Sequence, residues 1–229
     1  MDNWNGIGSL LIACVEILLL INLLIFAEKN KLNRIAIVMI ALLAGYQAME
    51  FLMCGIELQN SFFPYFAFVI ISFLPPSGLL LVLTLTRSHT LTLNLTQSLI
   101  FLPAVVFVIY YTFIIPQFAV TSCAVLYASY NYPLGELYGL FYYLPVLITI
   151  IILVISVRKS TNSKVRFISK ILLTGNIIVS IPVITGFILM FTGNYYLILK
   201  IESIMCKFAF AYAVCLAFVC LHNPKKKIN

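Results

Sequence analysis

Seven long apolar segments constrain this chain more than any other feature of its sequence. They lie at residues 7–27, 35–54, 61–85, 95–115, 137–157, 167–191 and 197–221 of the 229-residue sequence. A helix that crosses a bilayer needs about 20 predominantly apolar residues, and each segment is long enough. Because 63% of the residues are hydrophobic and only 9% are charged, a soluble core could not bury this surface. We therefore predict an all-α polytopic membrane protein, a single seven-helix transmembrane domain over residues 1–229.

The Lys and Arg residues of the connecting segments predict the orientation of the bundle. They follow the first, third, fifth and seventh apolar segments: Lys29, Lys31, Arg34, Arg87, Arg158, Lys159, Lys164, Arg166, Lys225, Lys226 and Lys227. The other connections contain none. Basic residues in short loops mark the cytoplasmic side, so we expect the N-terminus outside and the C-terminus in the cytoplasm of a cell membrane, most simply a bacterial inner membrane. The net charge of +7 thus reflects topology, and we expect no nucleic-acid partner.

Three apolar segments carry an ionisable residue in their interior, namely Glu16, Glu50 and Lys207. A charge inside hydrocarbon costs several kcal/mol, so such residues need a partner and usually have a function. At a rise of 1.5 Å per residue, Glu16 and Lys207 lie roughly 14 and 15 Å below the outer boundary, whereas Glu50 lies roughly 7 Å below it. If the first and seventh helices are neighbours, the matching depth predicts a pair between Glu16 and Lys207.

Polar residues near these charges predict a pocket in the outer half of the bundle. Helical spacing places Tyr46 and Gln47 on the face of Glu50, and Lys200 and Ser203 in one stripe with Lys207. The predicted ligand-binding residues are Glu16, Tyr46, Gln47, Glu50, Lys200, Ser203 and Lys207. We interpret them as a site for a small ligand or a proton. The alternative is an internal ion pair that only fixes helix packing.

The segment at residues 116–136 is the longest one predicted on the outer side. It contains Cys123, which an oxidising exterior could join to Cys54 at the outer end of the second helix. Spacing alone does not establish the geometry of that bridge, so free thiols remain the alternative. The same segment contains Tyr127, Tyr130 and Tyr132. These tyrosines predict either a lid over the bundle or aromatic anchors at the membrane interface.

The sequence gives little support to catalysis. The two histidines, His89 and His222, have no neighbouring Asp, Glu or Cys at the spacing of metal ligands. There is no nucleophile elbow and no phosphate-binding loop. We therefore expect no enzymatic activity, no catalytic residue, no metal and no cofactor. The expected partners are the lipid bilayer, a small-molecule ligand and a separate output protein in the cytoplasm or the membrane.

Two other functions remain open. A small-solute transporter needs a polar path to both faces, and only Asn176 and Ser180 form a polar pair deep on the inner route. A retinal-binding photoreceptor needs a lysine in the middle of the seventh span, which Lys207 supplies. However, the third segment has no acidic residue, and Ser203 stands four positions before the lysine where microbial rhodopsins have Asp.

A family resemblance supports a role as a receptor-like membrane sensor, which is the function that we expect for the predicted pocket. The order Tyr46, Gln47, Ala48, Met49, Glu50, Phe51, then Leu74, Pro75, Pro76, then Leu83, Thr84, Thr86, Arg87 resembles the seven-helix sensor region at the N-terminus of some bacterial histidine kinases and cyclases. It covers about a quarter of the chain. The resemblance implies signal reception. Because the sequence ends at Asn229, soon after the seventh segment, we expect signalling through a partner.

Overall fold

The computed structural model describes residues 4–58, 60–86, 93–125, 127–191 and 195–222, and their side chains except those of 93–98, 136, 186–191 and 195–203. Within this part the chain is almost entirely helical. The helices are α1 (Ile7–Phe26), α2 (Lys31–Cys54), α3 (Phe62–Ser72), α4 (Leu74–Thr86), α5 (Leu93–Thr112), α6 (Gly135–Lys159), α7 (Ser163–Phe191) and α8 (Tyr195–Leu221). A short 3-10 helix, η1 (Ile115–Gln117), precedes the antiparallel strands β1 (Ala119–Cys123) and β2 (Ala128–Asn131).

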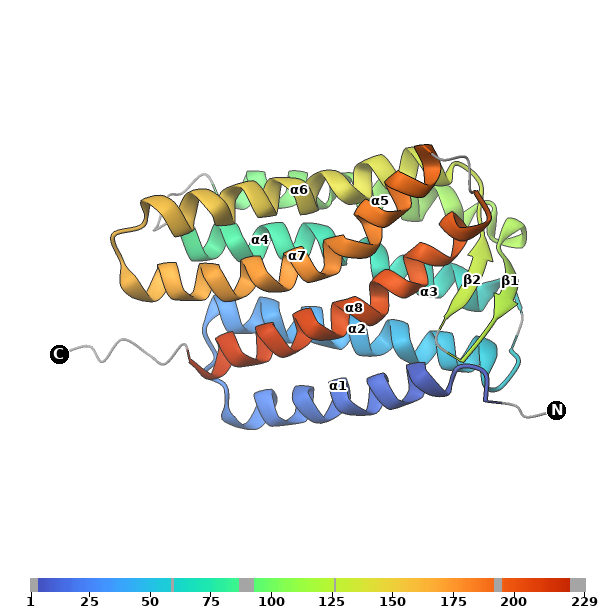
Figure 1. Ribbon diagram of the computed structural model, residues 1–229, viewed down its shortest axis with the longest axis horizontal. Helices are drawn as coiled ribbons and strands as arrows, with labels where there is room; N and C mark the ends of the chain where they lie inside the picture. Colours follow the sequence, from blue (N-terminus) through green and yellow to red (C-terminus); the bar gives the residue numbers. More distant parts are fainter. Residues whose placement is uncertain (1–3, 59, 87–92, 126, 192–194, 223–229) are drawn as a thin grey trace.

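The helices run along the long axis of the molecule and form one bundle (Figure 1). The two strands form a hairpin at one end, which we call the hairpin end. The N-terminus lies near this end and the C-terminus at the opposite end (Figure 1).

Six helical stretches among the described residues are long and apolar enough to cross a membrane: Ile7–Phe26, Lys31–Cys54, Phe62–Thr86, Leu137–Lys159, Ser163–Thr185 and Ile204–Leu221. A seventh apolar helix, Leu99–Thr112, is shorter. The prediction of a mostly helical protein with several helices that can cross a membrane is therefore confirmed. The seventh span and the orientation in the membrane stay predictions.

Helix boundaries differ from the predicted ones where polar residues extend a helix or prolines interrupt it. For example, α2 begins at Lys31 rather than at residue 35, because the side chain of Asn30 caps it and accepts a hydrogen bond from the Asn33 amide at 2.8 Å. The predicted helix at 61–85 is split at Phe73 into α3 and α4. Pro75 and Pro76 lack amide donors and are tolerated in the first turn of α4, so the break falls just before them.

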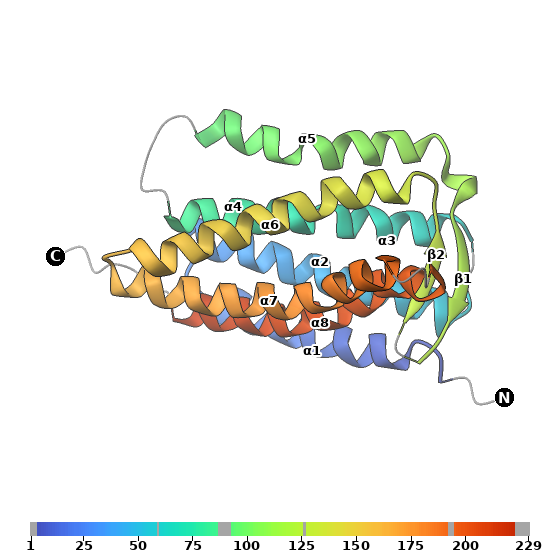
Figure 2. The same ribbon diagram turned by 45° about the horizontal axis from the view of Figure 1, so that its top comes forward.

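Helix α2 lies at the centre of the contacts that build the site. It packs against α1, α3, α4 and α8, and α1 also packs directly against α8. The first and last apolar helices are therefore neighbours, which was the condition for a pair between Glu16 and Lys207. By contrast, α5 lies at the edge of the bundle beside α4 and α6 (Figure 2).

The hairpin is anchored to the bundle by aromatic rings. We call Phe68, Tyr111, Phe118, Tyr132 and Tyr138 the aromatic cluster; Phe68 contacts the other four rings, with centroids 4.5–5.7 Å apart. Tyr111 also donates a hydrogen bond of 2.5 Å to the carbonyl oxygen of Pro133, just after β2. Tyr130 is buried as well. Tyr130 and Tyr132 therefore pack toward the bundle, while Tyr132 and Tyr127 stay half-exposed. That these tyrosines form a lid or anchor the protein at the membrane interface stays a prediction.

A disulfide also fixes the hairpin. Cys54, the last residue of α2, is bonded to Cys123, the last residue of β1, with their Cα atoms 5.4 Å apart. At its tip, the carbonyl oxygens of Ala124 and Val125 accept hydrogen bonds from the amides of Gly6 and Gly8, at 3.0 and 3.1 Å. Gly6 has a φ of 74°, and a Cβ there would lie 3.1 Å from the amide nitrogen of Gly55. Both the positive φ and this close approach favour glycine at position 6, where the start of α1 lies beside the end of α2.

Candidate functional site

The site begins with one face of α1. Its buried residues include Ser9, Ala13 and Glu16, which are spaced by four and three positions and so form a single stripe. Because α1 packs only on α2 and α8 among its main contacts, this stripe brings two polar side chains into the interface of three helices. The other faces of α1 carry exposed apolar residues such as Leu11 and Leu18.

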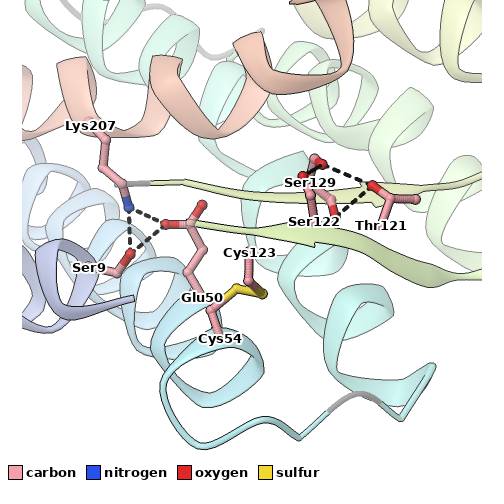
Figure 3. Close-up of a disulfide and its surroundings, with 8 residues drawn as sticks. All are labelled: Ser9, Glu50, Cys54, Thr121, Ser122, Cys123, Ser129 and Lys207. Carbon is pink, nitrogen blue, oxygen red and sulfur yellow. Dashed lines mark hydrogen bonds and ion pairs between the residues drawn. A yellow bond between two sulfur atoms is a disulfide. The ribbon is translucent and has the colours of Figure 1, made fainter. Parts of the chain in front are cut away.

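Lys207 of α8 lies in the same interface. Its ammonium donates hydrogen bonds to Ser9 Oγ at 2.8 Å and to Gln47 Oε1 at 2.5 Å, and it forms an ion pair with Glu50 Oε2. The lysine side chain is 12% exposed and that of Glu50 is 1% exposed. We call Ser9, Gln47, Glu50 and Lys207 the polar cluster; Figure 3 shows three of its members converging beside the hairpin and the disulfide.

The hydrogen-bond donors of the polar cluster have acceptors within the cluster or on the neighbouring backbone. An ammonium has three donors, and those of Lys207 meet three acceptors from α1 and α2. Ser9 in turn donates to Glu50 Oε2 at 3.0 Å, and Gln47 Nε2 donates to the carbonyl oxygen of Cys206 at 3.0 Å. A buried ion pair offsets its desolvation only when such additional hydrogen bonds are present. The geometry therefore explains how a charge is kept inside apolar helices.

The predicted pair between Glu16 and Lys207 is wrong, because Lys207 pairs with Glu50. Helical side chains lean toward the N-terminus of their own helix. Helix α8 begins at the hairpin end and α2 ends there, so the side chains of Lys207 and Glu50 lean toward each other and close the difference in depth. Glu16, on a helix that also begins at the hairpin end, leans in the same direction as Lys207. The depth of the Cα atoms alone did not include this lean.

Glu16 is the unsatisfied member of the site. It is 0% exposed, and neither carboxylate oxygen has a hydrogen-bond partner among the described residues. It still interacts electrostatically with Lys207. Buried polar groups are normally hydrogen-bonded, so an exception of this kind needs an explanation.

Three further residues were predicted to bind a ligand: Tyr46, Lys200 and Ser203. Tyr46 is fully buried on α2 and interacts with Glu50 and with Tyr130 of the hairpin. It lies next to the polar cluster and not among the groups that bind Lys207. Lys200 and Ser203 belong to α8, but their side chains are outside the described residues. That any of these residues binds a ligand stays a prediction.

Two features of the site were missed in the sequence. Ser9 is not among the predicted ligand-binding residues, although its spacing from Glu16 places both on one helix face. The hairpin was expected only as a loop, because its strands have four and five residues and an irregular register between Val120 and Ser122. It contacts every helix of the site: α1 through Gly6 and Gly8, α2 through Cys54, and α8 through β2.

Chemically, the site offers one ammonium and two carboxylates in an interior without bulk water. Such a set can hold or exchange a proton, or accept a small polar ligand that replaces one of the internal partners of Lys207. Within the described ranges, no three His, Cys, Asp or Glu side chains gather as metal ligands would.

Comparison with known proteins gives no further assignment. No model of a protein family, no curated protein and no solved structure matches the chain. The resemblance to bacterial sensor regions therefore stays a prediction based on residues 46–51 and 74–87.

Proposed function

We propose that the chain is a receptor-like sensor that crosses a cell membrane seven times, with the hairpin end outside. It detects a small ligand or a proton at the polar cluster and passes the signal to a separate protein. The basic residues of the α1–α2 and α6–α7 connections support this orientation, because both connections lie at the end opposite the hairpin.

One observation carries the proposal: Lys207 has a tight partner in Glu50, and a second buried carboxylate, Glu16, lies nearby without a hydrogen bond to any described residue. A purely structural ion pair needs one acid. The additional acid gives the cluster an alternative state, in which Glu16 binds a proton, a ligand or Lys207 itself. Two arrangements that differ by a few kcal/mol are what a population shift requires.

The hairpin supports a signalling role for these arrangements. Cys54 follows Glu50 by one helical turn, and the amides of Gly6 and Gly8 bind the hairpin tip directly before Ser9. A change in how Lys207 is held would therefore act on α1, α2 and the hairpin together. This is a contiguous set of contacts between the cluster and the outer surface.

The test is thermal stability of the purified protein in lipid nanodiscs across pH and against a panel of amino acids, amines and carboxylic acids. We expect at least one condition to raise the melting temperature of the wild type and of Lys170→Met, a matched change at an exposed lysine of α7. The Lys207→Met variant should lose this response. A flat response in the wild type, or a response that Lys207→Met retains, would contradict the proposal.

A small-solute transporter is the second candidate, favoured by the position of Asn176 and Ser180 on the wall of an interior cavity. The two functions are separated by one assay. Any compound that raises the melting temperature is tested for accumulation in proteoliposomes. A sensor binds it without accumulation, whereas a transporter accumulates it in a manner that depends on Lys207.

A further inference from the structure

A cavity lies at the centre of the bundle, on the side of α8 away from the polar cluster. It has a volume of about 70 Å³ and is lined by residues of α2, α4, α6, α7 and α8. Its wall includes Met39 of α2, Gly78 of α4, Thr149 of α6, Asn176 of α7, and Met205 and Tyr212 of α8. Among the residues whose side chains the structure describes, none that lines the cavity is charged.

The polar groups of the wall are mostly used by their own helices. Thr149 donates to the carbonyl oxygen of Pro145 at 2.8 Å, and Ser180 donates to that of Asn176 at 2.8 Å. A water molecule needs two to four polar partners to be held in a cavity. The wall therefore favours an occupant that is largely apolar.

Two side chains of the wall are incompletely hydrogen-bonded. Asn176 is 8% exposed, and its amide nitrogen donates to the Leu172 carbonyl oxygen at 2.9 Å; no hydrogen bond among the described residues uses its amide oxygen. Tyr212 is 7% exposed; its hydroxyl interacts with the Asn176 side chain, although without the geometry of a full hydrogen bond, and has no other hydrogen-bond partner among the described residues. The Tyr212 ring lies against α7 because position 175 is Gly: a Cβ there would be 2.6 Å from Tyr212 Cδ2.

We propose that this central cavity binds a small, uncharged, mostly apolar molecule that carries one hydroxyl or carbonyl group, with Asn176 and Tyr212 at its polar end. The described wall residues offer no charge that would offset the desolvation of an ionic ligand, which favours an uncharged one. An engineered cavity of about 150 Å³ binds benzene, so a volume of about 70 Å³ holds roughly three non-hydrogen atoms by proportion. The flexible side chains of Met39 and Met205 can adapt to a slightly larger ligand.

The site is separate from the polar cluster but connected to it. Cys206 lines the cavity, and its carbonyl oxygen accepts the hydrogen bond from Gln47, which also binds Lys207. An occupant of the cavity would therefore act on the same turn of α8 that carries Lys207. Binding itself does not depend on Lys207, so the cavity site can be tested independently of the proposed function.

The test uses two probes, xenon and 1-propanol, with the methyl groups of the six methionines labelled with ¹³C for NMR in nanodiscs. We expect saturable shifts of the Met39 and Met205 methyl signals with both probes, while Met53, buried on α2 away from the cavity, stays unchanged. The Asn176→Leu variant should keep the response to xenon and bind 1-propanol about three- to tenfold more weakly, the effect of one lost hydrogen bond.

Two filling variants provide the control. Ala209→Leu and Gly78→Val place methyl groups in the cavity from opposite sides, and a Cβ at position 78 meets only Met39 Cε, at an ordinary distance of 3.5 Å. We expect either folded variant to lose both responses. Shifts that rise without saturation, or that persist in a filling variant, would show partitioning into the lipid and overturn the proposal. Equal 1-propanol affinity in Asn176→Leu and wild type would overturn the assigned polar end.

Discussion

Two clusters of side chains beside the hairpin differ in their chemistry. On one side, Phe68 packs among four other aromatic rings, and Tyr111 bonds to the Pro133 carbonyl oxygen. On the other side, Lys207 is held by Ser9, Gln47 and Glu50. Ring packing is dispersed over many weak contacts and has little dependence on solution conditions. The polar cluster depends on the charge of a few groups, and one nearby acid, Glu16, has no hydrogen bond.

This difference suggests a division of roles between the two sides. The aromatic cluster keeps the hairpin in place, whereas the polar cluster can change its hydrogen bonds without disturbing the fold. Mutations in the aromatic cluster should therefore change stability alone, whereas those in the polar cluster or at Glu16 should change the response to ligand or proton, with or without a change in stability.

The largest effect is expected from Glu50→Gln. Removing one partner of a buried ion pair leaves the other uncompensated and lowers the free energy of unfolding by about 3–5 kcal/mol. Reversible unfolding in mixed micelles measures it, with Glu57→Gln, a change at an exposed residue, as the control. Adding Lys207→Met should recover part of the loss; if the two changes are simply additive, the residues do not interact.

Loss of the Cys54–Cys123 disulfide should have the next largest effect. The bridge closes a long loop, because its cysteines are 69 positions apart in the sequence, so its removal as the Cys54→Ser, Cys123→Ser double variant should cost about 2–4 kcal/mol. The exposed free cysteine Cys14 provides the control variant Cys14→Ser. Unchanged unfolding of the double variant would mean that the aromatic cluster alone holds the hairpin.

A smaller effect is expected for Tyr111→Phe in the aromatic cluster. It removes the hydrogen bond to Pro133 but keeps the ring, so the free energy of unfolding should fall by about 1 kcal/mol. The stabilising response to pH or ligand should be the same as in the wild type. If that response disappears as well, the two sides are not independent.

The smallest change in stability is expected for Glu16→Gln. No hydrogen bond is lost, and the amide has nearly the shape of the acid, so the free energy of unfolding should change by less than about 1 kcal/mol. The response to pH or ligand should nevertheless be lost. A loss of stability as large as that of Glu50→Gln would instead identify Glu16 as a tightly paired charge.

Much of the fold follows from the sequence, because apolar segment length dictates helices in lipid. The interface of α1, α2 and α8 was also expected, as was the possible bridge between Cys54 and Cys123. The partner of Lys207 was not, because pairing depends on where side-chain ends lie and not on the depth of Cα atoms. Ser9, the short hairpin and the cavity beside Asn176 depend on packing between segments distant in the sequence, which residue periodicity does not contain.

The central claim is that Glu16 and Glu50 both take part when the site responds. Infrared difference spectroscopy of the carboxyl groups, recorded in nanodiscs across the pH step or ligand addition that stabilises the protein, observes this directly, with Glu16→Gln and Glu50→Gln used to assign the bands. We predict difference bands from both carboxyl groups in the wild type. Glu16→Gln, which loses the response, should lose both bands, whereas Glu50→Gln should lose the band of Glu50. A stabilising response without a change in either carboxyl group would contradict a switch at the polar cluster and leave the Lys207–Glu50 pair as a structural element.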